Sequence, residues 1–280
     1  DPNTLLGDTG QERLALMKRK GVNRLTIGLQ SLDDKILKLM NRHHTAEQAV
    51  ESIKVSQKAG FQVNIEFIFG YPGQTLEGWA KVIEQAVTLD VEEIQMYRLK
   101  VEAYGDYQGP IKNIKEKHPE KVPTNEEAIM MKQTAIDILA QHGYHENLRR
   151  VFTRKPEHYS HYAHNQCCRL FDEVGFGLTA FSSLRDRFAL NTQDFQEYYS
   201  LIESGKLPIN RGIVRSREEQ LRWAIVLPIK NRTVRKNDFL RATGEPLEGK
   251  FAEKFAMLKE YGLVEENEKE IGLTKLGCFF

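Results

Sequence analysis

Two segments in which apolar and polar side chains alternate constrain the fold of this chain more than any other feature. The first, residues 24–31, carries leucine or isoleucine at every second position, and the second, residues 63–69, repeats the pattern with isoleucine and phenylalanine. Because successive side chains of a strand point to opposite faces, each segment predicts a strand with one apolar and one more polar face. Residues 93–101 predict a third strand.

Helix signals separate these strands. Thr45 and Gln48 can form a capping box, Gly60 can end the helix that follows, and Thr75 can cap a helix that reaches about Leu89. Short strands that alternate with helices are typical of a parallel sheet covered by helices. We therefore predict an α/β fold, an incomplete parallel β/α barrel of the TIM type, in which functional groups gather at the carboxyl ends of the strands.

The character of the chain changes after the third strand. Residues 103–123 are polar, contain Gly and Pro, and predict a loop, and the alternating pattern is absent beyond Tyr144. We predict that residues 1–145 form the barrel part and residues 146–280 a C-terminal α+β domain on the substrate side. The last part of that domain contains, in this order, an amphipathic helix, a hairpin through Asn267 and a short helix. This order of elements resembles a winged helix.

The composition limits the classes of partner. Lys and Arg number 40 against 39 Asp and Glu, so a net charge of +1 provides no field that would attract nucleic acid or an acidic membrane. No apolar run reaches the length of a membrane span. The three cysteines, Cys167, Cys168 and Cys278, are too few for a disulfide framework. We expect a cytoplasmic protein without a nucleic-acid partner and without membrane insertion.

Three polar residues on neighbouring strand–helix units indicate a site. Glu66 lies in an otherwise apolar strand, where a buried carboxylate needs a partner or a ligand. Gln30 lies at the end of the preceding strand, and Arg42 follows the next helix. Each residue also has a structural interpretation: an internal ion pair for Glu66, a loop brace for Gln30, and a helix-dipole partner for Arg42. The combination favours a ligand site.

Two further patterns are weaker. The sequence GFGLTA at residues 175–180 fits a loose dinucleotide fingerprint, but it lacks a strand–helix–strand frame and a ribose-binding acid, so we discount a nicotinamide site. His158, His161 and His164 recur every third residue beside Cys167. Because no carboxylate or CxxC pattern accompanies them, we favour a polar segment on the substrate side and predict no metal site in this chain.

Several of these motifs occur together in one known family. The strongest are GVNRLTIGLQSLDDKILKLMNRHHTAEQA at residues 21–49 and NIEFIFGYPGQT at residues 64–75, and YRLKVE, HN, GFGLTAFS and GLVEENEKEIGLTKLG follow in the same order. In this respect the chain resembles radical S-adenosylmethionine (radical SAM) enzymes of the oxygen-independent coproporphyrinogen III oxidase type. The resemblance covers nearly the whole chain.

The resemblance implies a set of site residues. Gln30, Arg42 and Glu66 correspond to residues that line an S-adenosylmethionine site in that family, with Glu66 in place of the usual Asp. Backbone or side-chain atoms near Arg98 and Phe181 would join the same site. The resemblance assigns no catalytic residue.

The resemblance also implies a [4Fe-4S] cluster held by a CxxxCxxC motif, which this sequence does not contain. In the family that motif lies upstream of the matching segments. We therefore expect residues 1–280 to be the C-terminal portion of a longer protein, with the cluster ligands outside this chain. We expect this portion alone to be inactive.

The function implied by the resemblance is radical chemistry on a tetrapyrrole. The cluster, reduced by an electron donor, would cleave S-adenosylmethionine to a 5′-deoxyadenosyl radical, and oxidative decarboxylation of coproporphyrinogen III is the expected reaction. Relatives that are haem-utilisation methyltransferases or haem-binding chaperones leave two alternatives open. In the chaperone alternative, histidines of residues 158–164 or Cys167 would ligate haem. A nucleic-acid role for the winged-helix-like end is a third alternative, and we disfavour it.

Overall fold

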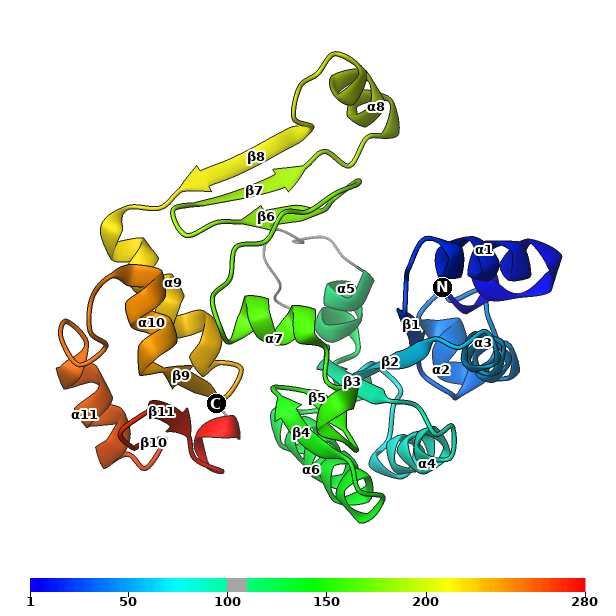
Figure 1. The fold of residues 1–280 in the computed structure, drawn as a ribbon. Coiled ribbons are helices and arrows are strands. Elements are labelled where there is room, and N and C mark those ends of the chain that lie inside the picture. The colour runs from blue at the N-terminus through cyan, green and yellow to red at the C-terminus, as the bar shows by residue number, and fades with distance from the viewer. Residues whose placement is uncertain (100–109, 280) are drawn as a thin grey trace. The chain divides into compact units, whose positions relative to one another are not determined.

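The computed structural model describes residues 1–99 and 110–279, which form two compact units, Asp1–Tyr159 and Ser160–Phe280 (Figure 1). The predicted division into a barrel part, residues 1–145, and a substrate-side domain, residues 146–280, stays a prediction. Among the described residues, no helix combines the length and apolar composition that a membrane span requires.

Unit 1 is built on a five-stranded sheet with the order β1-β2-β3-β5-β4. Strands β1, β2 and β3 are parallel neighbours, and β5 and β4 continue the sheet antiparallel. The strands span Arg24–Gln30 (β1), Gln62–Phe69 (β2), Glu93–Arg98 (β3), His145–Leu148 (β4) and Val151–Thr153 (β5). The three predicted strands therefore form, although β3 ends at Arg98 and residues 100 and 101 of the predicted third strand lie outside the described part. The short β4–β5 hairpin lies beyond Tyr144, where that pattern is absent.

Helices precede and follow the parallel strands. They are α1 (Gly7–Arg19), α2 (Asp34–Leu39), α3 (Ala46–Lys58), α4 (Leu76–Val87), α5 (Pro110–Lys117) and α6 (Asn125–Gln141), with short 3-10 turns at Pro2–Leu5, Pro119–Lys121 and Pro156–His158. Of these helices, α2, α3 and α4 connect the parallel strands. The capping box of Thr45 and Gln48 forms as predicted at the start of α3. The predicted loop at residues 103–123 is wrong in part, because α5 forms there. Half-buried Ile111 and Ile114, three residues apart, give this helix an apolar side. Residues 103–109 lie outside the described part.

The apolar face of the sheet holds the core of unit 1. Ile65 and Phe67 are fully buried there beneath Trp79 of α4. The indole of Trp79 lies 6.2 Å from the ring of Phe67 and 5.6 Å from that of Phe69, centroid to centroid, and its Nε1 donates to the Met131 carbonyl of α6 at 2.9 Å. This packing fixes α4 and α6 on one side of the sheet. The polar side chains of the same strands therefore face the other way.

Unit 2 contains two three-stranded antiparallel sheets. The first consists of β6 (Phe181–Ser183), β7 (Arg187–Asn191) and β8 (Ile209–Val214), preceded by α7 (His161–Cys167) and interrupted by α8 (Phe195–Glu203). The second has the order β10-β11-β9 and packs with α9, α10 and α11 around Phe239. Its elements are α9 (Arg217–Ile229), β9 (Thr233–Arg235), α10 (Lys236–Thr243), α11 (Ala252–Glu260), β10 (Val264–Glu266), β11 (Glu270–Leu273) and a final 3-10 turn, Gly277–Phe279. The mixed α/β character is as predicted.

Candidate cofactor-binding site

The polar face of the parallel strands brings two of the predicted site residues together. In the register of the sheet, Gly28 of β1 lies beside Glu66 of β2, and Glu66 lies beside Gln95 of β3. Neighbouring residues in register share a face, so Gly28, Glu66 and Gln95 form one row across three strands. Gln30 lies at the carboxyl end of β1, above this row.

Gln30 reaches the row because the backbone of β1 bulges at its end. The register shifts between Gly28 and Gln30, and Gln30 has a φ of 66° although it is not glycine. Its side chain then folds back over Gly28, so that a Cβ at residue 28 would lie 2.5 Å from Gln30 Nε2 and 3.9 Å from Glu66 Oε2. Gly28 is therefore the open position over which the amide and the carboxylate converge.

His44 supports this bulge from below. It is buried, and its Nε2 lies 3.1 Å from the carbonyl oxygen of Leu29, the residue at the bulge. Since a carbonyl can only accept, the proton of the neutral ring lies on Nε2. Burial lowers the pKa of His44 below its ordinary value, and the nearby Arg42 lowers it further. The sequence pattern did not single out His44, because its role depends on a carbonyl fifteen residues away.

Glu66 keeps one oxygen available. Its Oε1 accepts a hydrogen bond of 3.2 Å from the hydroxyl of Tyr97, on β3. For Oε2, no hydrogen-bond or ion-pair partner is recorded within residues 1–99 and 110–279. The side chain is half-buried. A half-buried carboxylate with an uncommitted oxygen suits a ligand that carries hydroxyl or ammonium donors.

The internal ion pair that we considered for Glu66 forms instead at Glu93, one row below. Glu93 Oε2 lies 2.7 Å from Arg24 NH2, and only 2% of the Glu93 side chain is exposed. Arg24 also donates through NH1 to the His158 carbonyl at 2.8 Å. Beside this pair, Asn64 Nδ2 donates to the hydroxyl of Thr26 at 3.2 Å. The charges of the lower row are thus paired with each other, although Asn64 Oδ1 is buried without a hydrogen-bond partner among the described residues. The Glu66 carboxylate has no such ion pair there and can meet a ligand.

Arg42 follows α2 and is half-buried. Its backbone N–H donates to the Leu37 carbonyl at 2.9 Å, so the loop continues directly from the end of the helix. The hydroxyl of Tyr71, in the turn after β2, donates to the Leu39 carbonyl at 3.0 Å. This bond ties the end of α2 to the end of β2. It therefore holds the segment that carries Arg42 near the carboxyl ends of the strands.

Arg98 lies on the other face of the sheet from the row formed by Gly28, Glu66 and Gln95, and Phe181 is described within unit 2. Arg98 is paired in register with Phe69, so its side chain is on the helix-covered face, and its NH2 donates to Asn125 Oδ1 at 2.6 Å. Phe181 belongs to unit 2, where it is 40% exposed and stacks on Phe188 with 5.6 Å between ring centroids. The Arg98 side chain therefore points away from the face that carries Glu66.

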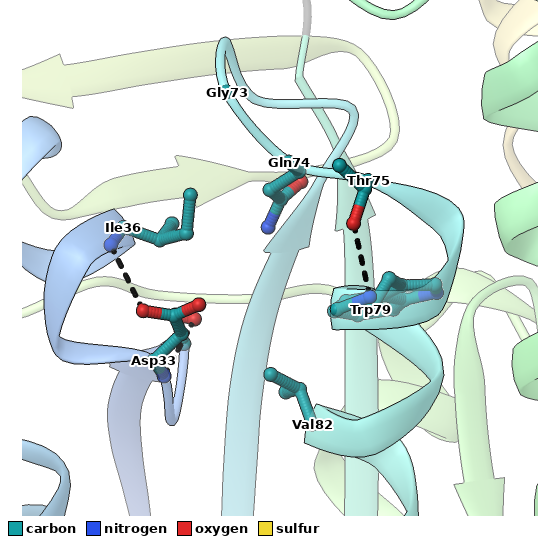
Figure 2. A pocket seen from close by; sticks show the side chains of 9 residues that line it. Asp33, Ile36, Gly73, Gln74, Thr75, Trp79 and Val82 are labelled. Carbon is teal, nitrogen blue, oxygen red and sulfur yellow. Dashed lines mark hydrogen bonds between the residues drawn. The ribbon is translucent and has the colours of Figure 1, made fainter.

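A small cavity lies on the helix side of the strand ends. Its volume is about 40 Å³, and Figure 2 shows Asp33 and Ile36 on one wall opposite Gln74, Thr75 and Trp79. A space of this size holds about one water molecule. None of the predicted site residues lines it, and Gln74 serves the turn itself by donating to the Ile68 carbonyl at 3.0 Å. The cavity is thus separate from the polar face.

The histidine and cysteine segment is divided between structural elements. His158 ends a 3-10 turn in unit 1, whereas His161 and His164 are three residues apart on α7 of unit 2. Burial lowers the pKa of His164, and burial raises the pKa of Cys168 to about 12. Within the described residues, no three His, Cys, Asp or Glu side chains converge as metal ligands. The residues present fit an adenosyl cofactor, but they do not fit an iron–sulfur cluster.

Comparison with known proteins shows what the chain is similar to. The family model of the radical SAM superfamily matches residues 2–86, which include β1, β2 and the convergence over Gly28. Over these residues the chain is similar to radical SAM proteins. The proteins that match most of its length include oxygen-independent coproporphyrinogen III oxidases and a haem chaperone, and the resemblance indicated by the motifs is confirmed.

Two relatives illustrate the match. The chain is 26% identical over 276 residues to the haem chaperone HemW of Bacillus subtilis, a match that covers 96% of this chain and 70% of the relative. It is 24% identical over 289 residues to the oxygen-independent coproporphyrinogen III oxidase of Helicobacter pylori strain ATCC 700392, covering 95% of this chain and 61% of that protein. The chain therefore spans less than two thirds of the oxidase.

The fold agrees with a solved structure. Coproporphyrinogen III oxidase (HemN) from Escherichia coli, described as a radical SAM enzyme, superposes with a TM-score of 0.73 at 22% sequence identity. The match covers 96% of this chain and 66% of that one. At this identity the likeness shows the fold alone. It places the parallel strands of unit 1 in the same kind of β/α architecture.

Proposed function

We propose that the polar face of β1 to β3 binds S-adenosylmethionine and that the protein acts on a tetrapyrrole by radical SAM chemistry. The observation that supports the proposal is the convergence of Gln30 Nε2 and Glu66 Oε2 over Gly28. An amide donor and a carboxylate acceptor over a residue without a side chain suit the polar groups of an adenosyl cofactor. Bound S-adenosylmethionine supplies the reactive group in this class of chemistry, and the protein supplies binding and orientation.

The proposed contacts differ in kind. Gln30 would donate through Nε2, Glu66 would accept through Oε2, and Arg42 would provide a positive charge at the strand ends. Arg98 would join through its backbone, because its side chain is bound to Asn125 on the other face. Phe181 would contribute an aromatic surface from unit 2. The cluster that radical SAM chemistry uses would be held by ligands outside the 280 residues.

The proposed reaction is oxidative decarboxylation of the coproporphyrinogen type. It follows from the oxidases among the relatives, whose names state that activity. An electron donor would be required to reduce the cluster. This part of the proposal concerns the full-length protein, since the chain spans only part of those relatives.

The binding experiment uses the full-length protein with its cluster assembled. Equilibrium titration with S-adenosylmethionine should show an affinity that falls at least about ten-fold in Gln30→Ala, which removes the amide donor, and in Glu66→Gln, which removes the charge of the acceptor. Glu77→Gln is the matched control, since it makes the same change to an exposed carboxylate of α4, on the helix-covered face, and should keep the affinity. Unchanged affinity in both site variants would refute the proposed site.

A second candidate is haem carriage, which the match to the haem chaperone HemW favours. In that function, His158, His161, His164 or Cys167 would provide an axial ligand. Titration of alanine variants with haem tests this alternative by the absorbance of bound haem. A spectrum that changes in one variant would support ligation from this segment, and identical spectra in all four would count against it.

We further infer that α9 to β11 form a winged-helix-like unit. The supporting observation is the order helix, strand, two helices and hairpin, with β11 between β10 and β9 in the sheet. Helix α11, in the place of a recognition helix, carries two Lys and two Glu and therefore has no positive excess. We propose that the unit serves packing rather than nucleic-acid binding. A filter-binding assay that showed salt-sensitive DNA affinity would contradict this inference.

A further inference from the structure

The carboxylate of Glu66 is held on one side by a residue that none of the sequence motifs assigned to the site. The hydroxyl of Tyr97 lies 3.2 Å from Glu66 Oε1 and 2.6 Å from Gln95 Oε1. Both acceptors lie on the polar face of the sheet, and Glu66 and Gln95 are neighbours in register. Tyr97 therefore stands at the edge of the row that Glu66 occupies.

The hydrogen bonds of Gln95 determine the direction in which the hydroxyl of Tyr97 donates. Gln95 Nε2 donates to Glu93 Oε1 at 2.9 Å, and the other oxygen of Glu93 lies 2.7 Å from Arg24 NH2. The amide of Gln95 must therefore turn its oxygen toward Tyr97, because a carboxylate cannot donate in the reverse orientation. The hydroxyl of Tyr97 then acts as a donor that Gln95 and Glu66 share.

The hydroxyl remains a donor at every pH at which the protein would work. Burial, and then the charge of Glu66, raises the pKa of Tyr97 to about 12. The guanidinium of Arg150 covers the ring of Tyr97 at 4.4 Å from its centroid, which fixes the plane of the ring. Tyr97 is therefore held in position by contacts that do not include Glu66.

We propose that Tyr97 is a positioning residue of the cofactor site, whose hydroxyl holds Glu66 Oε1 so that Oε2 faces the ligand. This inference rests on the proposed function. The ligand group that Glu66 meets would be a hydrogen-bond donor, such as the ribose hydroxyls or the ammonium group of S-adenosylmethionine. Glu66 has three side-chain torsions. If its carboxylate were not anchored beforehand, binding of the ligand would restrict these torsions, and the entropy cost would lower the affinity.

Tyr144 offers a matched comparison in the same unit. Its hydroxyl donates to the Val91 carbonyl at 2.7 Å, and the guanidinium of Arg154 covers its ring at 4.5 Å. Burial raises its pKa to about 12, as it does for Tyr97. Tyr144 belongs to the apolar core and contacts no predicted site residue. Tyr97→Phe therefore removes a part-buried hydroxyl and Tyr144→Phe a buried one, and only the first removes a bond to Glu66.

The experiment measures affinity for S-adenosylmethionine in the full-length protein with its cluster assembled. We expect Tyr97→Phe to weaken binding about five-fold, the effect of one shared hydrogen bond to a charged acceptor, and Tyr144→Phe to change it less than two-fold. The double variant Tyr97→Phe with Glu66→Gln should bind no more weakly than Glu66→Gln alone, because Tyr97 acts through Glu66. The effect of Tyr97→Phe should be constant from pH 6 to pH 9.

The outcomes separate the two proposals. If Glu66→Gln weakens binding while Tyr97→Phe does not, the positioning role is wrong and the site assignment stands. If Tyr97→Phe and Tyr144→Phe weaken binding equally, the effect is structural and the inference is overturned. If Glu66→Gln leaves the affinity unchanged, the proposed site fails, and the positioning role fails with it.

Discussion

The two faces of the parallel strands in unit 1 use adjacent residues for opposite purposes. On one face, Ile65 and Phe67 are fully buried against Trp79. On the other, Glu66 lies between them in sequence and keeps an uncommitted oxygen on a half-buried side chain. A step of one residue along β2 therefore changes the side chain from one that stabilises the fold to one that can bind a ligand. Substitutions on the two faces should separate stability from affinity.

The largest effect is expected on the apolar face. Trp79→Ala removes the indole that packs on Phe67 and Phe69 and bonds to the Met131 carbonyl. We expect it to lower the unfolding free energy of unit 1 by about 3–5 kcal/mol, as large-to-small core substitutions do. Differential scanning calorimetry measures this loss, and unit 2 should keep its transition because Trp79 is not part of its core. A loss below about 1 kcal/mol would contradict the assigned role of this face.

The second effect concerns the ion pair of Arg24 and Glu93 in the lower row of the polar face. Glu93→Ala leaves the guanidinium of Arg24 without its carboxylate in a buried place, which costs about 3 kcal/mol in comparable ion pairs. Replacing both residues by Met should cost less than the single substitution, since no buried charge is then left alone. Urea unfolding can be followed by Trp79 fluorescence in a Trp223→Phe background, because these are the two tryptophans of the chain. A double variant less stable than Glu93→Ala would contradict the ion-pair interpretation.

The difference between the faces also explains how much of the fold the sequence could predict. Alternation located β1, β2 and β3, because one face of each strand is covered by helices and the pattern must repeat every second residue. Strand β8 has no such pattern to follow, since all six of its residues are exposed. Strands β5, β6 and β9 have three residues each, too few for a period to be recognised. Their positions depend on tertiary pairing.

The candidate site was predictable in part for the same reason. Glu66 is conspicuous as a carboxylate within an apolar strand, and Gln30 as a polar group at a strand end. Tyr97 and His44 were not conspicuous, because their roles depend on partners that the fold brings close from distant positions, Glu66 in one case and the Leu29 carbonyl in the other. The backbone bulge that turns Gln30 back over Gly28 leaves no signal in composition or spacing.

A smaller effect is expected at the boundary between the faces, where His44 holds the Leu29 carbonyl. Because burial lowers the pKa of His44, the unfolded chain binds its proton more readily than the folded one. The contribution of His44 to stability is complete above about pH 6.5 and is lost as the pH falls toward the lower pKa of the folded state. The slope for this one group is at most about 1.4 kcal/mol per pH unit.

Urea unfolding of unit 1 between pH 7.5 and pH 5 measures this slope. His44→Gln retains a side-chain N–H that can reach the Leu29 carbonyl but cannot take up a proton in this range. It should therefore flatten the pH dependence of unit 1 while changing its stability at pH 7.5 only slightly. An equal slope in the variant and the parent protein would show that other groups carry the acid sensitivity.

The smallest effect on stability is expected where the polar face is open. In Gly28→Ala the new Cβ would lie 2.5 Å from Gln30 Nε2, the mobile end of a side chain, so the amide can move aside without disturbing the backbone. We expect a stability change within about 0.5 kcal/mol, as for substitutions away from packed features. The affinity for S-adenosylmethionine should nevertheless fall as far as in Gln30→Ala, because the amide no longer lies over residue 28. The double variant should bind like either single one, since both remove the same contact. If Gly28→Ala bound the cofactor normally, the position of Gln30 over Gly28 would be unnecessary for binding, and the two faces would no longer divide stability from affinity at this residue.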